Sequence, residues 1–159
     1  MPSQTATISR VPIAIRAAAE LELRRRLSPR YDWTKQARPS QLEPAGDWHT
    51  WLILTGRGWG KTRTGAETVR LWKGRDPIIH LIAPASADGR DVMVEGPAGI
   101  LPTSPHWDRP HYEPSKRRLT WHNGARATLF SAEEPDRLRG PQAYAAWSDE
   151  AAAWKYPET

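Results

Sequence analysis

The sequence predicts an α/β fold with a mostly parallel sheet flanked by helices. Short apolar segments of strand type alternate with segments of helical type, which favours parallel strands joined by helical crossovers. A glycine-rich segment joins the first of these strands to the helix that follows it. An Asn-Gly dipeptide later in the chain is the strongest short signal for a hairpin, so we also expect one antiparallel β-hairpin.

The first third of the chain contains a helix, a connector and a strand. Residues 13–27 predict a helix that ends at Ser28-Pro29, because Ala and Leu recur with helical spacing. Residues 29–47 are rich in proline and polar residues and predict an extended connector. Residues 48–55 (WHTWLILT) form an apolar run with β-branched residues, which predicts a buried strand. After the glycines, residues 63–73 have helical character.

The middle of the chain predicts a second strand and a second helix. Residues 77–83 (PIIHLIA) are an apolar run that Pro84 ends. Residues 86–95 predict a helix with Ser86 as its N-cap and with Val92 and Met93 facing the core. The following residues, 96–114, contain many prolines and predict loops.

The last third predicts the hairpin and the final strand. Residues 116–122 and 125–131 flank Asn123-Gly124. Residues 133–138 predict a short helix, and residues 143–148 predict a strand that leads into Asp149-Glu150.

Length and composition narrow the class of protein. The chain has 159 residues, enough for one domain with a sizeable core, and its nine tryptophans favour packing over disorder. It has no cysteine, which excludes disulfides, thiolate zinc sites and cysteine nucleophiles. No apolar run approaches the roughly 20 residues of a membrane helix, and residues 1–10 lack the apolar part of a secretory signal. We expect a cytoplasmic protein without membrane contact.

The net charge of +5 comes from the N-terminal region. Residues 1–40 carry eight Lys/Arg and three Asp/Glu, whereas the two signs balance in the rest of the chain. Such a basic segment either contacts nucleic-acid phosphates or is the solvated face of a helix. The sequence does not choose between the two.

The segment Thr55–Thr62 (TGRGWGKT) predicts a phosphate-binding loop, because it lies between a predicted strand and a helix. Its glycines let successive backbone N–H groups point at phosphate oxygens, and the helix N-terminus adds partial positive charge. Lys61 is placed to reach the β- and γ-phosphates, and the Thr62 hydroxyl to ligate Mg²⁺. Thr55 stands where the usual pattern G-x-x-x-x-G-K-S/T has glycine. The plain alternative is a glycine-rich surface turn.

The pair Asp149-Glu150 lies at the C-terminal end of a predicted strand, where ligands bind in open α/β sheets. We expect Asp149 to bind Mg²⁺ and Glu150 to act as the general base for the attacking water. Taken alone, two acids after a strand more often mark a solvated helix N-terminus, where acids are favoured.

The order of these motifs resembles that of the large terminase subunit of tailed bacteriophages. The resemblance runs from about Tyr31 to the last residue. The segments that carry it are Arg38-Pro39-Ser40-Gln41 with Gly46-Asp47-Trp48, WLILTGRGWGKTRTGAE (51–67), IAPASADGRDVMVEGPAGIL (82–101) and RLRGPQAYAAWSDEAAAW (137–154).

The resemblance implies the N-terminal ATPase portion of a DNA-packaging motor, with a P-loop NTPase-type fold. It implies ATP and Mg²⁺ as cofactors, and double-stranded DNA, a portal and a small terminase subunit as partners of a homo-oligomeric ring. The location would be the cytoplasm of the bacterial host. Residues 1–47 would form a basic helix and an adenine-side connector, and residues 48–159 the ATPase domain.

The resemblance also implies residue roles. Arg57 would contact the nucleotide phosphates, Gln41 the adenine, and Arg139 a nucleotide on a neighbouring subunit as an arginine finger. Arg139 before Gly140 is equally typical of a helix end. The remaining cofactor-binding residues would be Gly56, Gly58, Trp59, Gly60, Lys61 and Thr62.

The family continues beyond the acidic pair with further strands, a coupling segment and a nuclease domain, whereas this sequence ends nine residues after Glu150. We therefore expect an incomplete sheet and no nuclease activity. Two alternatives stay open: an inactive or binding-only prophage remnant, and a P-loop nucleic-acid translocase of another class.

Three further groups of residues have an ordinary and a functional interpretation. Trp59 either packs on a neighbouring turn or covers a nucleotide or DNA. His106 and His111 are surface loop residues or, less in keeping with their spacing, zinc ligands. The hairpin cations either protect a sheet edge or contact a DNA backbone; they are Lys116, Arg117, Arg118 and Arg126.

Overall fold

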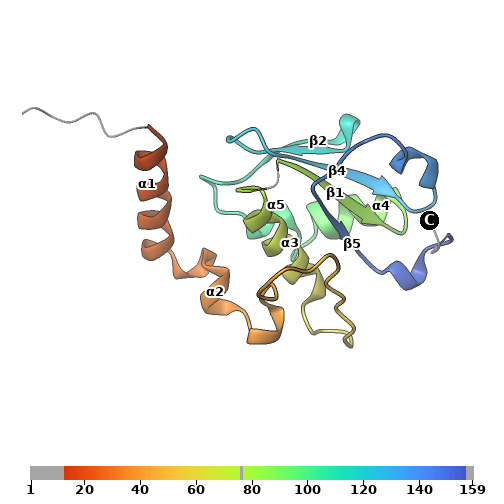
Figure 1. The fold of residues 1–159 in the computed structure, drawn as a ribbon, viewed down its shortest axis with the longest axis horizontal. Helices are drawn as coiled ribbons and strands as arrows, with labels where there is room; N and C mark the ends of the chain where they lie inside the picture. The colour runs from red at the N-terminus through yellow and green to blue at the C-terminus, as the bar shows by residue number, and fades with distance from the viewer. Residues whose placement is uncertain (1–12, 76, 157–159) are drawn as a thin grey trace, which may run out of the picture. The chain divides into compact units, whose positions relative to one another are not determined.

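The computed structural model describes residues 13–75 and 77–156 (Figure 1). The chain divides into two compact units, Met1–Gln36 and Ala37–Thr159. The beginning of the predicted basic segment, with Arg10, lies outside the described residues. Among the residues that are described, no helix combines the length and the apolar character needed to cross a bilayer.

The first unit is helical. Helix α1 spans Ile13–Leu27, with the bounds that the sequence predicts. A 3-10 turn, η1 (Pro29–Tyr31), and the short helix α2 (Trp33–Gln36) follow it. The prediction of an extended connector over residues 29–47 is therefore wrong in part, and a further 3-10 turn, η2 (Pro39–Gln41), opens the second unit. Both 3-10 turns begin at a proline, whose fixed φ suits the first position of a helical turn.

The second unit is built on a five-stranded mixed sheet with the order β2-β3-β4-β1-β5. Strands β1 (Ile78–Ala83), β4 (Arg126–Ser131) and β5 (Ala145–Ser148) are parallel, with β1 in the centre. Strands β2 (His111–Glu113) and β3 (Arg118–Thr120) extend the sheet on the other side of β4 in antiparallel pairs. The α/β class and the parallel core are confirmed, while the sheet as a whole is mixed.

The predicted hairpin is confirmed as β3 and β4. Leu119 pairs with Ala127 in antiparallel register, and the Trp121 N–H donates to the Ala125 carbonyl at 2.9 Å. Gly124 supplies the positive φ of +87° at the turn, which glycine adopts without strain. The Asn123 amide donates to the Lys73 carbonyl at 2.8 Å. Lys73 is the C-cap of helix α3 (Lys61–Trp72), so the turn is attached to the C-terminal end of that helix.

Helices cover one face of the sheet (Figure 1). The longest is α3 (Lys61–Trp72), followed by α4 (Ser86–Asp88), the π-helical η3 (Gly89–Val94) and α5 (Ile100–Thr103). The core beneath them combines Ala66 and Val69 of α3 with Ile79 and Leu81 of β1, all fully buried. The remaining 3-10 turns are η4 (Pro114–Lys116), η5 (Pro135–Leu138) and η6 (Ala151–Ala153).

The helix predicted over residues 86–95 forms with a different register. Its second half is a π-helix, closed by the Glu95 N–H on the Arg90 carbonyl at 2.9 Å. The wider turn rotates Val92 outward, where it is 40% exposed, and buries Met93 as predicted. Ser86 is inside the helix and Ala85 occupies the N-cap, whose N–H donates to the Asp88 carboxylate at 3.2 Å.

The strand predicted over residues 48–55 does not form. The segment 51–55 has no regular secondary structure, its exposure alternates, and it has no strand partner among the described residues. Leu52 is 71% exposed and Leu54 81% exposed. An apolar run with β-branched residues favours a strand, but a strand also needs a neighbour whose N–H and C=O groups are free to pair.

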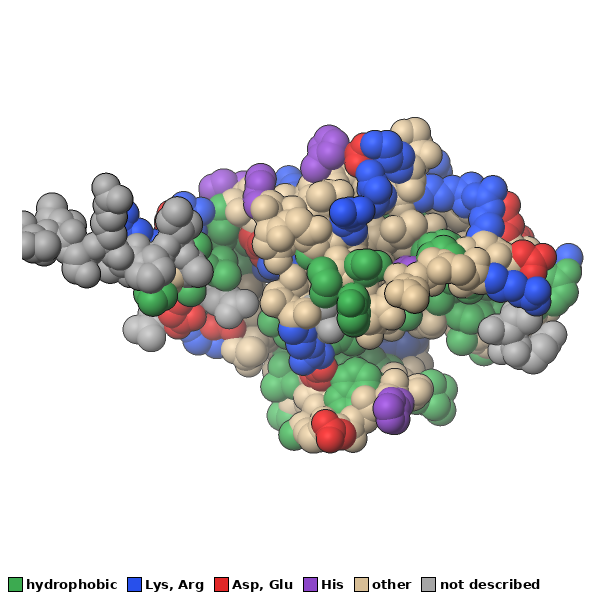
Figure 2. All heavy atoms as spheres, turned by 45° about the horizontal axis from the view of Figure 1, so that its top comes forward, with side chains coloured by type: hydrophobic (Ala, Val, Ile, Leu, Met, Phe, Trp, Pro, Cys, Tyr) green, Lys and Arg blue, Asp and Glu red, His purple; other side chains and the backbone are tan. Residues whose placement is uncertain are grey.

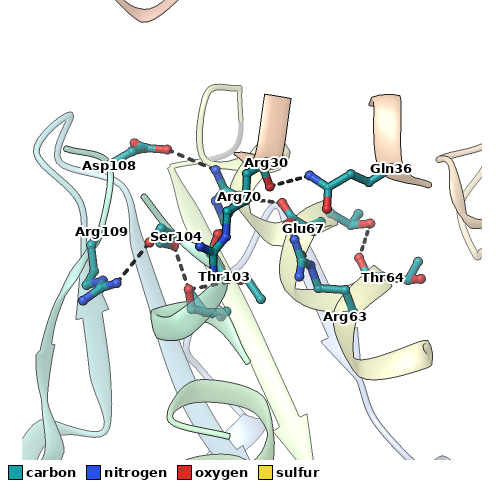
Figure 3. Close-up of polar contacts among 12 residues, drawn as sticks. Arg30, Gln36, Arg63, Thr64, Glu67, Arg70, Thr103, Ser104, Asp108 and Arg109 are labelled. Carbon is teal, nitrogen blue, oxygen red and sulfur yellow. Dashed lines mark hydrogen bonds and ion pairs between the residues drawn. The ribbon is translucent and has the colours of Figure 1, made fainter. Parts of the chain in front are cut away.

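A buried charge holds α3 and the segment after α5 together (Figure 3). Glu67 is 2% exposed, and its carboxylate accepts hydrogen bonds from Arg63, at 2.9 Å from Nε, and from Arg70. Arg70 in turn donates to the Thr103 carbonyl at 3.1 Å, and Lys73 pairs with Asp108 at 3.0 Å. The network satisfies a carboxylate that would otherwise be costly to bury.

We expect Glu67→Ala to lower the free energy of unfolding by about 3 kcal/mol or more, because it leaves the buried Arg70 guanidinium with Asp108, 3.9 Å away, as its remaining carboxylate partner. Urea unfolding followed by circular dichroism measures this change. The matched control is Asp91→Ala, which breaks an exposed ion pair with Arg90 and should change stability by less than about 1 kcal/mol. Equal effects of the two substitutions would contradict the structural role of Glu67.

Candidate functional site

The glycine-rich loop joins the segment 51–55 to α3. Gly58 and Gly60 have φ values of +77° and +97°, which glycine alone adopts readily. Gly60 is the N-cap of α3, and its carbonyl accepts the first helical bond from the Thr64 N–H at 2.9 Å. The free N–H groups of the first turn and the positive end of the helix dipole therefore lie where the loop ends.

Lys61 folds back over this loop. Its ammonium donates to the carbonyls of Thr55 at 3.1 Å and Gly56 at 3.3 Å. Arg57 is exposed, and Thr62 is half-buried on the first turn of α3. The loop thus gathers two exposed or half-buried cations and a hydroxyl around backbone donors, a combination suited to phosphate.

The turn η2 supports the loop from outside. Gln41 is 6% exposed: its carbonyl oxygen accepts from the Arg38 N–H at 3.0 Å, and its amide donates to the Trp59 carbonyl at 3.1 Å. The Arg38 guanidinium donates to the same carbonyl and lies over the Trp59 ring, 5.2 Å from its centre. A Cβ atom at Gly60 would lie 3.0 Å from the Gln41 amide nitrogen, so the loop and the turn are in close contact.

The acidic pair follows β5 directly. The Asp149 N–H donates to the Ile82 carbonyl at 2.9 Å and so extends the pairing with β1 by one residue. Burial raises the pKa of the half-buried Asp149 carboxyl above its ordinary value of 3.8, and the charge of Glu150 raises it further, whereas the charge of Lys61 lowers it. The charges of Lys61 and Asp149 are thus close enough to interact. Glu150 is exposed and has a left-handed backbone with φ +45°.

Trp147 of β5 packs directly on α3. A Cβ atom at Gly65 would lie 2.1 Å from Cε2 of the Trp147 indole, a distance that no side chain can occupy. Gly65 is three residues beyond Thr62, and Trp147 is two residues before Asp149. This contact therefore fixes the helix that begins at the loop relative to the strand that ends at the acids.

Comparison with known protein families identifies the family of this chain. Residues 52–159 match the N-terminal region of the large terminase subunit of the T4likevirus type. The chain belongs to this family. Searches among curated proteins and among solved structures found no match. This terminase chain is thus related to a part of a viral DNA-packaging motor.

The structure of this terminase chain brings some predicted residues together and leaves others apart. Gln41, Trp59 and Gly60 are in contact, and Lys61 is close enough to Asp149 to influence its pKa. Arg139 is 81% exposed and pairs with Asp136 of η5 at 3.3 Å. Among the described residues, no group of three or more His, Asp or Glu side chains gathers as a metal site, and His106 and His111 are exposed.

Sequence reasoning missed the roles of Gly65 and Trp147 in this terminase chain. A glycine inside a helix is unfavourable by about 1 kcal/mol relative to alanine, so Gly65 signals that something approaches the helix closely. The sequence does not say what approaches, because Trp147 is distant along the chain.

We expect Gly65→Ala to destabilise the protein by about 1–3 kcal/mol, because its methyl group overlaps the Trp147 ring. Chemical unfolding measures the loss, and the double variant Gly65→Ala/Trp147→Leu should recover part of it because it removes the overlapping ring. Gly56→Ala is the matched control, since a Cβ atom there meets nothing within 4 Å. A neutral Gly65→Ala variant would show that the contact does not fix the helix.

We expect Asp149→Asn to raise the melting temperature at neutral pH. The pKa of Asp149 is raised in the folded state above 3.8, so the folded protein binds more protons than the unfolded chain as this group titrates. The free energy of unfolding of the protein with aspartate at this position therefore falls as the pH rises. Asparagine removes this charge, so the gain should shrink as pH falls towards 3.8. Thermal melts over a pH series measure it.

The control for Asp149→Asn is Asp91→Asn. The hydrogen bond from Arg90 lowers the pKa of Asp91, so asparagine there should not raise the melting temperature. A lower melting temperature for Asp149→Asn at neutral pH would contradict the burial argument.

Proposed function

We propose that residues 48–159 form the ATP-binding and ATP-hydrolysing domain of a viral DNA-packaging motor, with a P-loop NTPase-type fold. The observation that carries the proposal is the loop that opens α3, with Gly58 and Gly60 in left-handed conformations and Lys61 within electrostatic reach of Asp149. Membership of the large terminase family supports the same activity, and with it double-stranded DNA, a portal and a small subunit as partners of a ring. Residues 1–47 would add a basic helix and the adenine-side turn.

In this proposal the loop binds the phosphates. The N–H groups of the first turn of α3 donate to phosphate oxygens, and Lys61 exchanges the carbonyls of Thr55 and Gly56 for the β- and γ-phosphates. Arg57 is exposed beside them and would add a second cation. The side-chain amide of Gln41 holds the loop by donating to the Trp59 carbonyl. To contact adenine, this amide would have to give up that hydrogen bond.

The donor set fits Mg²⁺. Asp149 is a half-buried carboxylate whose charge is disfavoured by burial, and a divalent cation would stabilise that charge. The Thr62 hydroxyl on α3 is an oxygen ligand of the kind that Mg²⁺ accepts beside phosphate oxygens. When bound, the ion would neutralise the charge that develops on the phosphates.

Glu150 is the proposed general base. It is exposed at the end of β5, next to Asp149, and its left-handed backbone turns the chain away from the strand. From there it would accept a proton from the water that attacks the γ-phosphate. Arg139 is highly exposed and would serve a neighbouring subunit by exchanging its ion pair with Asp136 for a phosphate.

The test is the binding of ATPγS with Mg²⁺ to the full chain by titration calorimetry. We expect Lys61→Ala to weaken binding about 10–100-fold, since it removes a charge-assisted contact to phosphate. Lys116→Ala removes an exposed ammonium of the hairpin region instead and should leave affinity unchanged. Unchanged affinity in Lys61→Ala would refute the nucleotide site.

Hydrolysis is tested separately from binding. Glu150→Gln should retain ATPγS affinity and lose the release of phosphate from ATP, because it removes only the base. If the unmodified chain binds ATPγS but releases no phosphate, the chain is a nucleotide-binding module and the catalytic part of the proposal is wrong.

A further inference from the structure

The antiparallel part of the sheet carries a groove that the proposed ATPase site does not use. The groove has a volume of about 690 Å³, and three arginines, three histidines and one glutamate are among the residues that line it. Figure 2 shows His and Lys/Arg side chains gathered side by side over the β2 end of the sheet.

Strand register explains how the groove forms. His111 of β2 pairs with Thr120 of β3, which pairs with Arg126 of β4, so the three side chains form a row across one face. Glu113 and Arg118 form the next row on the same face. The residues between the rows point to the opposite face, where Leu119 and Ala127 are fully buried in the core under the helices. The groove therefore faces away from α3.

The cations of the groove are only partly neutralised. Arg118 pairs with Glu113 at 3.3 Å, and the same carboxylate also holds Lys116. Arg126 is exposed and has no ion pair with the described residues. Arg109 donates to the Ser104 carbonyl at 3.3 Å, a neutral partner that leaves its charge unbalanced. One acid thus faces three arginines in the groove.

We propose that this groove binds the phosphates of a nucleic-acid backbone. Guanidinium groups at the sheet present paired donors to phosphate oxygens, and the Thr120 hydroxyl and the imidazoles add further donors. The groove is open and spans three strands, so it can follow a run of phosphates. The choice of double-stranded DNA rests on the proposed function, whereas the phosphate chemistry follows from the groove itself.

The experiment measures binding of a short fluorescent DNA duplex to the full chain without nucleotide, by anisotropy over a series of salt concentrations. We expect Arg118→Gln/Arg126→Gln to weaken binding about 10-fold or more and to lower the salt slope by about 2, since each phosphate contact contributes about 1 to that slope. Glu113→Gln removes the one acid of the groove and should tighten binding.

Two controls accompany these variants. Arg90→Gln removes one charge, as Arg126→Gln alone does, but on η3, which packs on the opposite face, and should leave DNA affinity unchanged. Arg126→Gln alone changes an exposed side chain without an ion pair, so it should fold normally even if the double variant does not. Unchanged affinity in Arg126→Gln, or an equal loss in Arg90→Gln, overturns the proposal.

A parallel measurement separates a backbone from a free anion. Thermal melts with inorganic phosphate show whether the groove holds phosphate alone, because binding to the folded state raises the melting temperature. Stabilisation by phosphate that the double variant loses, together with unchanged DNA affinity, would overturn the assignment to DNA. ATPγS binding tests the nucleotide site through Lys61, and DNA binding tests the groove through Arg118 and Arg126. Failure of the groove proposal would therefore change the DNA result and leave the ATPγS result as expected.

Discussion

The contact between Gly65 and Trp147 is the constraint on which the rest of the site depends. The indole occupies the space that a side chain at Gly65 would need, so α3 lies directly against β5. Because the glycine-rich loop opens α3 and the acids close β5, this single close approach sets how far the cation of Lys61 lies from the carboxylate of Asp149. The positions of the loop and the acids relative to each other are thus a result of packing between α3 and β5. The hydrogen bonds of Lys61 to Thr55 and Gly56 act within the loop.

Glu67, which is buried, and Asp149, which is half-buried, have opposite electrostatic surroundings. Glu67 is almost fully buried and is surrounded by arginines of its own helix, which stabilise its charge. Asp149 is half-buried beside another acid, and the hydrogen bond from the Glu150 backbone and the charge of Lys61 offset only part of the resulting rise in its pKa. A group that stabilises a fold is satisfied within it, whereas a group that is poised for a cation is left with an electrostatic cost. This electrostatic cost is what the proposed cation-binding role of Asp149 requires.

The sequence was sufficient for features that local chemistry decides. Helix α1 has the predicted bounds, and the Asn123-Gly124 turn forms the predicted hairpin, because helix periodicity and turn propensity act over a few residues. It was insufficient where distant residues decide. The segment 51–55 pairs with no strand among the described residues. The π-helical register of η3 exposes Val92. The basic groove exists only because β2, β3 and β4 align in register. The loop and the acids were predicted as types of residue, but their mutual placement by Gly65 and Trp147 was not.

The unpaired segment 51–55 has a consequence for how the protein behaves in solution. Its backbone N–H and C=O groups have no strand partner among the described residues, and Leu52 and Leu54 are largely exposed on it. Strand β5 ends the described sheet and also offers an open edge. Exposed apolar segments and open edges are the features through which chains add to one another edge to edge. Edge-to-edge association of this chain would therefore begin at Leu52 and Leu54 or at the free edge of β5.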